Sequence, residues 1–227
     1  EIPTPSISEY VSNKSEYRSL IAKDLQSTEQ FVKDTFNAAV NGSRLSSPDF
    51  KDIREHSLVK SFIREVPDFP KPGILFYDIT TLLKDADCFQ HIIDELTAKY
   101  KSAQITKVVG IESRGFILGC PLAYRLRAGF VPVRKPGKLP ADVYEVKYNL
   151  EYGSNSLAIH RDAITPGERI LVVDDLLATG GTADATVRLI RQLGGEVVEV
   201  AFLVELLFLA GREKLKDTQV HSLITYS

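Results

Sequence analysis

Two adjacent carboxylates, Asp174 and Asp175, stand between an apolar run and a glycine-rich segment. The apolar run, residues 170–173, reads ILVV and is typical of a strand buried on both faces of a parallel sheet. The glycine-rich segment consists of Ala178, Thr179, Gly180, Gly181 and Thr182. Its glycines allow a backbone turn to approach an anion, and Thr182 is expected to cap a helix over residues 183–193. The free amides at the start of that helix would then point at a phosphate.

The acidic pair indicates what else such a ligand contains. Two carboxylates would repel a phosphate, whereas the hydroxyl groups of a ribose are donors that carboxylates accept. Other phosphate loops do not fit, because no Lys-Ser or Lys-Thr follows the glycines and no Gly-x-Gly-x-x-Gly follows a strand. The segment therefore predicts a ribose-phosphate site. The alternative is a glycine-rich turn after a core strand.

The elements that must position this site alternate between helix and strand from residue 53 onward. Strands are expected at 74–77, 108–111, 130–133, 157–160, 169–173 and 197–204, and helices at 53–64, 86–101, 115–126 and 183–193. A long loop is expected over 134–148, and residues 197–210 are expected to form a core strand that leads into a helix. This alternation predicts an α/β fold with a mostly parallel central sheet flanked by helices. Ligands in such sheets collect at the carboxyl ends of the strands, where the two aspartates would lie.

Composition excludes several other classes of protein. The 227 residues are 44% hydrophobic with a formal net charge of −2, which suits a globular core and argues against a broad nucleic-acid-binding surface. The two cysteines and four histidines lack metal-ligand spacing, so we expect no metal held by protein side chains; these residues are Cys88, Cys120, His56, His91, His160 and His221. The most apolar run is too short to cross a bilayer. We therefore expect a cytoplasmic protein that contacts neither membrane nor nucleic acid.

Residues 1–50 are expected to form a helical N-terminal extension, separate from a domain at 51–227. Residues 1–56 carry seven basic and nine acidic side chains, which argues against a DNA-reading arm and an organelle transit peptide. The extension remains open to three interpretations. It is a fused helical module, an element that covers a dimer, or a segment foreign to the natural protein.

Residues 172–182 resemble the signature with which type I phosphoribosyltransferases bind phosphoribosyl diphosphate (PRPP). Five further blocks occur in the order seen in the adenine phosphoribosyltransferases: FPKPGILF (69–76), GIESRGF (110–116), RKPGKLP (134–140), LEYG (150–153), and VEL with GREKL (204–206 and 211–215). The resemblance runs from about Asp49 to the end of the chain. It implies the type I phosphoribosyltransferase fold, with a flexible catalytic loop and a small hood that covers the base.

The resemblance also implies a role for each matching residue. Asp174 and Asp175 would bind the ribose hydroxyls, and the segment from Ala178 to Thr182 the 5′-phosphate. The implied diphosphate ligands are Arg114, Arg134, Lys135, Lys138 and Tyr152, and the implied adenine ligands are Leu75, Phe76 and Arg114. Arg134 would reach across a dimer interface, although a charge run such as 134–138 is by itself more typical of a solvated surface. Tyr77 departs from the arginine that many relatives carry, which leaves the role of that side chain open.

Glu151 would be the catalytic carboxylate. Departure of diphosphate builds positive charge on the ribose, and the attacking base must lose a proton; a carboxylate stabilises the first and accepts the second. The resemblance thus implies formation of AMP and diphosphate from adenine and PRPP in purine salvage, by a homodimer with Mg²⁺ bound mainly through the diphosphate. Two alternatives remain: a phosphoribosyltransferase for another purine or xanthine, and a non-catalytic PRPP-sensing regulator whose N-terminal module binds DNA.

Overall fold

The computed structural model describes residues 59–150 and 153–227. The predicted N-terminal extension and the first half of the helix predicted at 53–64 lie outside these residues. Within the described part, residues 59–61 are helical, but a strand, β1 (Arg64–Pro67), begins where the predicted helix was to end. The helix prediction was therefore wrong at Arg64. No helix in the described ranges is long and apolar enough to cross a membrane.

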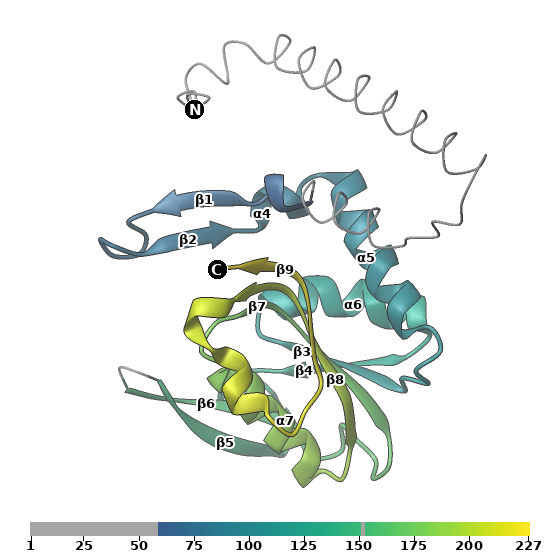
Figure 1. Cartoon of the computed structure of the whole chain (residues 1–227). Coiled ribbons are helices and arrows are strands. Elements are labelled where there is room, and N and C mark those ends of the chain that lie inside the picture. The colour runs from purple at the N-terminus through teal and green to yellow at the C-terminus, as the bar shows by residue number, and fades with distance from the viewer. Residues whose placement is uncertain (1–58, 151–152) are drawn as a thin grey trace, which may run out of the picture. The chain divides into compact units, whose positions relative to one another are not determined.

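A parallel sheet of five strands forms the centre of the domain, in the order β4-β3-β7-β8-β9 (Figure 1). The bounds are β3 (Lys107–Ile111), β4 (Gly129–Val133), β7 (Arg169–Leu177), β8 (Glu196–Leu206) and β9 (Val220–Tyr226). Every neighbouring pair in this sheet is parallel. The predicted α/β architecture is confirmed, while β9 was not predicted.

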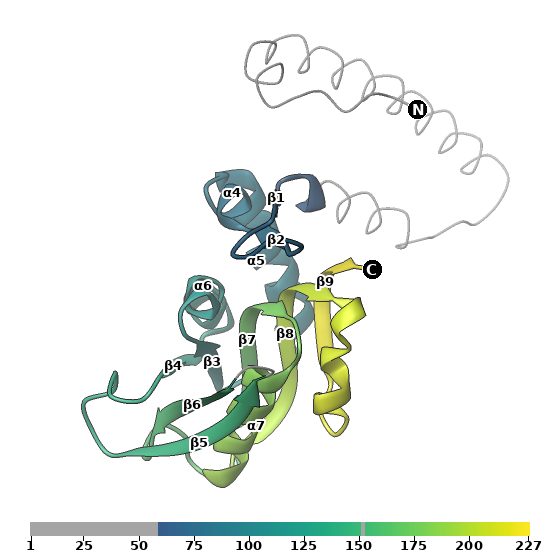
Figure 2. The same ribbon diagram turned by 90° about the vertical axis from the view of Figure 1, so that its left-hand side faces the viewer.

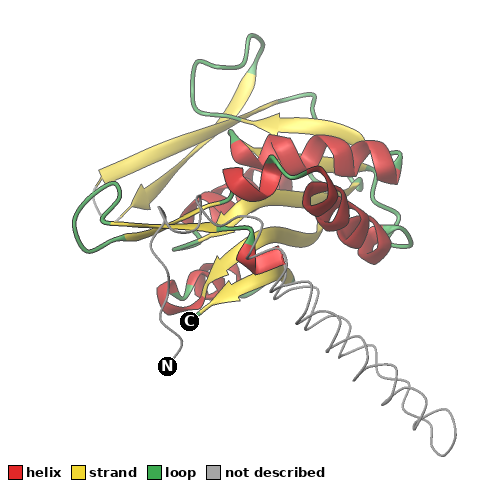
Figure 3. Cartoon of the chain, turned by 90° about the horizontal axis from the view of Figure 1, so that it is seen from above, coloured by secondary structure: helices red, strands yellow, loops and turns green. Residues whose placement is uncertain are grey.

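Helices cover both faces of this sheet because consecutive strand residues point to opposite sides. Leu171 and Val173 pack with α5 (Ala86–Tyr100) and α6 (Arg114–Leu126) in one core cluster, and Val172 packs with α7 (Gly181–Gln192) in the other. These three sheet residues are at most 1% exposed, which explains why the run is apolar at every position. Figure 2 shows the sheet and its helices turned by 90° from Figure 1, and Figure 3 colours the helices red and the strands yellow.

Two antiparallel hairpins flank the sheet. The first pairs β1 with β2 (Leu75–Asp78) and is followed by a short helix, α4 (Thr80–Leu83). The second pairs β5 (Val143–Leu150) with β6 (Gly153–His160), and an isolated bridge between Arg134 and Ala158 joins it to the end of β4. The loop predicted over 134–148 was therefore wrong from Val143 onward. Residues 143–148 of β5 are exposed or half-buried, so this part of the strand lacks the apolar run that marks the central strands.

The chain after β8 also differs from its prediction. Two 3₁₀ helices, η1 (Leu207–Leu209) and η2 (Gly211–Leu215), replace the helix expected after the strand. A left-handed residue, Ala210, separates them at φ 50°. The turn brings Gly211 back toward the end of β7, beside the predicted ribose-phosphate site.

Candidate active site

A polar pocket of about 290 Å³ opens at the carboxyl ends of β3 and β7. It is lined by the turn after β3, the end of β7 and the loop that leads into α7: Glu112, Ser113, Arg114, Asp174, Asp175, Leu176, Leu177, Ala178, Thr179, Gly180, Gly181, Thr182, Ala183 and Phe202. The structure thus brings both aspartates, all five residues of the glycine-rich segment and Arg114 into one pocket. Their shared position follows from the parallel pairing of β3 with β7.

The glycine-rich turn ends at Gly180, which occupies the N-cap position of α7 with φ 76°. No side chain caps this helix, so the prediction that Thr182 caps it was wrong. Thr182 lies in the first turn instead, and its hydroxyl is 3.4 Å from the Tyr148 hydroxyl. Because no side chain occupies the helix start, its first amides remain available to an anion. The N-terminus of α7 is therefore suited to a phosphate.

The turn at Gly211, between η1 and η2, packs against this glycine-rich loop. A Cβ on Gly180 would lie 2.2 Å from the Gly211 carbonyl oxygen, and a Cβ on Gly211 would lie 2.2 Å from the Ala178 carbonyl oxygen. Two backbones therefore touch where only glycine fits. Gly211 begins η2, whose Arg212 donates two hydrogen bonds of 2.6 Å to the carboxylate of Glu205, a residue only 2% exposed. The loop is thus supported by an ion pair between Arg212 of η2, whose side chain is half exposed, and the buried carboxylate of Glu205 on β8.

The two aspartates have different surroundings. Asp175 is 6% exposed and accepts a hydrogen bond from the Arg114 guanidinium. Asp174 accepts a hydrogen bond from the Asp175 backbone amide, at 2.9 Å. Burial of the Asp174 carboxyl, together with the negative charge of Asp175, raises the pKa of Asp174 well above its usual range. A carboxyl group in this position is stabilised by hydrogen-bond donors, which a ribose diol supplies.

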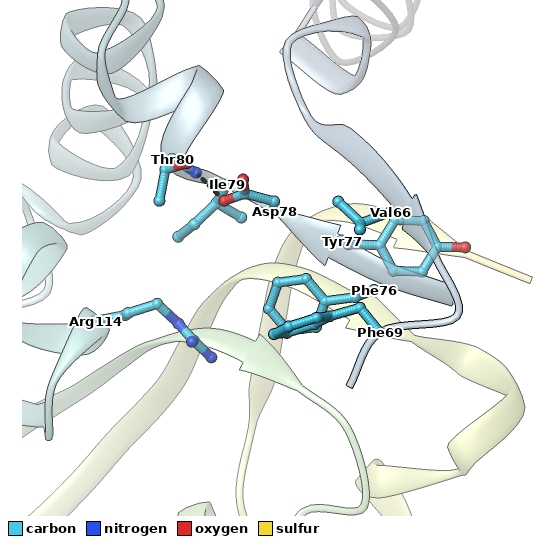
Figure 4. Close-up of a pocket in the computed structure, with 8 residues that line it drawn as sticks. All are labelled: Val66, Phe69, Phe76, Tyr77, Asp78, Ile79, Thr80 and Arg114. Carbon is cyan, nitrogen blue, oxygen red and sulfur yellow. Dashed lines mark hydrogen bonds between the residues drawn. The ribbon is translucent and has the colours of Figure 1, made fainter. Parts of the chain in front are cut away.

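A second pocket, of about 450 Å³, lies against the β1–β2 hairpin (Figure 4). Its lining is largely apolar and aromatic: Val66, Phe69, Phe76, Tyr77, Asp78, Ile79, Thr80 and Arg114. Phe69 and Phe76 meet edge to face with ring centroids 5.1 Å apart. Such a pocket suits a flat heterocycle, and Arg114 lines this pocket as well as the polar one. Leu75, the other predicted base ligand on β2, does not line it.

Asp78 is the acidic residue of this apolar pocket. It accepts hydrogen bonds from Arg64, its cross-strand partner on β1, and from the Thr80 amide at 2.9 Å. The Arg64 hydrogen bond, followed by that of Thr80, lowers the pKa of Asp78 to about 2. The ionised Asp78 carboxylate therefore connects β1 to the start of α4 through these hydrogen bonds.

The predicted cationic loop lies beside the polar pocket but does not line it. Arg134 donates hydrogen bonds of 3.2 and 3.1 Å to Glu112, and the Lys135 amide donates to the same carboxylate at 3.0 Å. The Arg134 guanidinium is the largest cause of the lowered pKa of Glu112. Lys135 and Lys138 are exposed side chains. The loop is therefore attached to the pocket wall through Glu112, a residue for which sequence reasoning assigned no separate role.

Two predicted residues, Glu151 and Tyr152, lie outside the described ranges and stay predictions. Several lining residues had no predicted role, including Phe202 from the neighbouring strand β8 and Val66 from the unpredicted strand β1. The parallel neighbours Ile111 and Val133 explain the Glu112–Arg134 pair, because each residue directly follows one of them. Knowledge of that register would have predicted the contact.

The chain is similar to known proteins in sequence and in structure. Residues 80–224 match the phosphoribosyl transferase domain family. The adenine phosphoribosyltransferase of Acidobacterium capsulatum is 64% identical over 169 residues, which cover 74% of this chain and 93% of that relative. The solved adenine phosphoribosyltransferase of Thermoanaerobacter pseudethanolicus is 51% identical with a TM-score of 0.73, over 75% of this chain and 99% of that one. The Saccharomyces cerevisiae enzyme, solved with an imino-altritol bisphosphate and adenine, is 40% identical with a TM-score of 0.72, over 75% and 99%.

The match over residues 80–224, together with a parallel sheet, an acidic pair and a glycine-rich loop at a helix start, makes this protein a phosphoribosyltransferase. These relatives with high sequence identity are all adenine phosphoribosyltransferases, which identifies the family within this class. The chain belongs to the adenine phosphoribosyltransferase family.

Proposed function

We propose that this protein forms AMP and diphosphate from adenine and PRPP. The observation that carries the proposal is that a polar pocket and an aromatic pocket meet at one residue, Arg114. A ribose phosphate in the first pocket and a purine in the second would place the anomeric carbon and the attacking nitrogen at their junction. Holding both reactants there removes much of the entropic cost of the reaction.

The described residues divide the work of binding. Asp174 and Asp175 accept the ribose hydroxyls, and the first turn of α7 binds the 5′-phosphate. Phe76 stacks on the base. Arg114 lies between the two pockets, where its guanidinium attracts the departing diphosphate. Arg134, Lys135 and Lys138 add positive charge at the rim of the polar pocket, where Arg134 is bonded to Glu112. The reach of Arg134 across a dimer interface stays a prediction.

Glu151 is proposed as the carboxylate that assists bond exchange. As the bond from the anomeric carbon to the diphosphate breaks, the ribose gains positive charge that a nearby carboxylate stabilises. The ring nitrogen of adenine then forms its bond to that carbon, and its proton passes to the carboxylate. Tyr152 would bind the departing diphosphate next to it.

Magnesium fits the donor chemistry of this site. The ionisable ligands that line the polar pocket are carboxylates, and neither a histidine nor a cysteine is among its described lining residues. Hard oxygen ligands suit Mg²⁺, and Asp174 and Asp175 would hold it through the ribose hydroxyls and waters. When bound, the ion supplies neutralisation of the diphosphate charge.

The deciding experiment measures which base discharges diphosphate from PRPP. We expect AMP from adenine, with guanine, hypoxanthine and xanthine at least about a hundredfold slower, because a site built for one pattern of hydrogen bonds rejects another. Faster turnover of another purine would replace adenine as the substrate. PRPP-dependent binding of duplex DNA without turnover would favour a regulator instead.

A paired substitution tests the role of Glu151. Glu151→Gln is expected to lower kcat by about 10²- to 10⁴-fold, the usual contribution of a general base. Glu145→Gln removes an exposed carboxylate from β5 and serves as the matched control. Equal activity of the two variants would remove Glu151 from the mechanism.

We further propose a homodimer that acts in cytoplasmic purine salvage. Two cysteines without a disulfide, Cys88 buried and Cys120 exposed, support a reducing compartment. Recovery of a free base as a nucleotide is salvage chemistry. Light scattering of the purified protein measures the oligomeric state, and a monomer with full activity would reject the dimer.

A further inference from the structure

Tyr77 borders the aromatic pocket, but its ring points to the opposite face of β2 from the ring of its neighbour Phe76. Consecutive residues of a strand point to opposite faces, and Figure 4 shows the Phe76 ring beside Phe69 while the Tyr77 ring extends the other way. There Tyr77 meets Tyr226, with ring centroids 3.8 Å apart and planes inclined by 34°. This contact bears on the role of the Tyr77 side chain, which the sequence left open.

Tyr226 is a rigid partner for that ring. It is the last residue of β9, pairs with Leu206 of β8 in the central sheet and is only 5% exposed. Lys60 covers the ring with its ammonium 4.1 Å from the centroid, and the same ammonium donates to the Thr225 carbonyl at 3.2 Å. The three side chains form a stack from the lysine through Tyr226 to Tyr77, which fixes the last strand to the hairpin.

The β1–β2 hairpin depends on contacts of this kind. It forms a separate two-stranded sheet with no strand pairing to the central sheet. An isolated hairpin is marginally stable, so its position must come from side-chain packing. Figures 1 and 2 both show β2 next to β9, the two strands that carry the tyrosines. The same hairpin carries Val66 and Phe76 of the aromatic pocket.

We propose that Tyr77 and Tyr226 are positioning residues that hold the β1–β2 hairpin, and with it Phe76, in place over the purine. The inference rests on the proposed function, since it assigns the aromatic pocket to the base. The phenols themselves stay uncharged, because burial raises the pKa of Tyr226 to about 12 and also raises the pKa of Tyr77.

The two substrates make the inference testable by steady-state kinetics. Tyr77→Ala and Tyr226→Ala are expected to raise the KM for adenine about three- to tenfold, the range that loss of one aromatic pair predicts. The KM for PRPP and kcat should change less than about twofold, because the phosphate loop and aspartates lie on other elements. Tyr77→Phe and Tyr226→Phe keep the rings and should match the wild type. An unchanged KM for adenine, or an equal rise for both substrates, would overturn the proposal.

Amide hydrogen exchange of the unliganded full-length protein gives a second readout that needs no turnover. Peptides from residues 64–78 should exchange faster in the two alanine variants only, while peptides from α7 exchange at the wild-type rate. Equal acceleration of both regions would mean general destabilisation and would also overturn the proposal. If wild-type protein forms no AMP, the proposed function fails, and the exchange data still decide whether the tyrosine stack holds the hairpin.

Discussion

Arg114 donates a hydrogen bond to Asp175 across the boundary between the two pockets. The carboxylate is nearly buried, whereas the side chain of Arg114 is 45% exposed and open to both pockets. The guanidinium therefore balances a buried charge while it remains accessible to ligands on either side. Arg114 donates to the same carboxylate that we assign to a ribose hydroxyl, so ribose binding must share or replace this contact.

Arg114→Met should impair both substrates. A hydrogen bond to a charged group contributes about 1.5–3 kcal/mol, so kcat/KM should fall roughly 10- to 100-fold for adenine and for PRPP. Arg125→Met is the control on the same helix: it removes an exposed pair with Asp94 and should cost less than about 1 kcal/mol of stability. A loss confined to one substrate in steady-state assays would contradict the shared position of Arg114.

Asp174→Asn should stabilise the unliganded protein while it weakens ribose binding. The pKa of Asp174 is raised in the folded state, so the unfolded chain ionises first as the pH rises above about 4. The free energy of unfolding of the wild type therefore falls as the pH rises from about 4 to the pKa of Asp174 in the folded state. The fall is about 1.4 kcal/mol for each unit by which the folded pKa exceeds the unfolded one. The variant lacks this loss, so its advantage in urea unfolding should be larger at pH 7.5 than at pH 5.

Asp175→Asn is the matched comparison for that measurement. It weakens the ion pair with Arg114, so it should lower the free energy of unfolding at pH 7.5 instead of raising it. Both variants should bind AMP more weakly in calorimetry. Stabilisation by Asp175→Asn, or destabilisation by Asp174→Asn at both pH values, would show that the two carboxylates have been assigned the wrong surroundings.

The sequence predicted the parts of this site that are contiguous in the chain. The ILVV run, the aspartates and the glycines occupy one strand, loop and helix, so local pattern and backbone chemistry located them. Contacts between distant segments could not be predicted, because they depend on register and on packing. The support of Gly180 by Gly211 is such a contact, and so is the stacking of Tyr77 on Tyr226. Strand β5 was missed for a related reason. It forms by pairing with β6, and over residues 143–148 it has no fully buried face that would mark it in the sequence.

Gly180→Ala should damage the phosphate site more than its backbone conformation alone predicts. An alanine at φ 76° costs about 1–2 kcal/mol, and its Cβ would also meet the Gly211 carbonyl oxygen at 2.2 Å. Gly167→Ala is the control, because φ is 86° and no atom lies within 4 Å of the added Cβ. Thermal unfolding should show both losses, but only Gly180→Ala should raise the KM for PRPP, by about tenfold or more. Equal KM values would remove the Gly211 contact from the support of the loop.

Arg212→Met should destabilise the protein by about 1.5–3 kcal/mol, because it removes the hydrogen bonds that the half-exposed Arg212 donates to the buried carboxylate of Glu205. In the wild type, the Arg212 hydrogen bond lowers the pKa of Glu205, so this stabilisation is present above about pH 4.3 and is lost as the pH falls through the folded pKa. The deficit of the variant in urea unfolding should therefore shrink toward pH 4.

A double substitution separates the charge from the support of the loop. Glu205→Leu with Arg212→Met removes both charges and should recover most of the lost stability, since the buried carboxylate is then replaced by an apolar side chain. Arg212→Met alone should raise the KM for PRPP, because η2 no longer holds Gly211 against the loop. The double variant should show the same raised KM. Arg191→Met, which removes exposed hydrogen bonds to Asp217 and Thr218, is the control and should cost about 1 kcal/mol or less. Full recovery of the KM along with stability would mean that the ion pair stabilises the domain without positioning the phosphate loop.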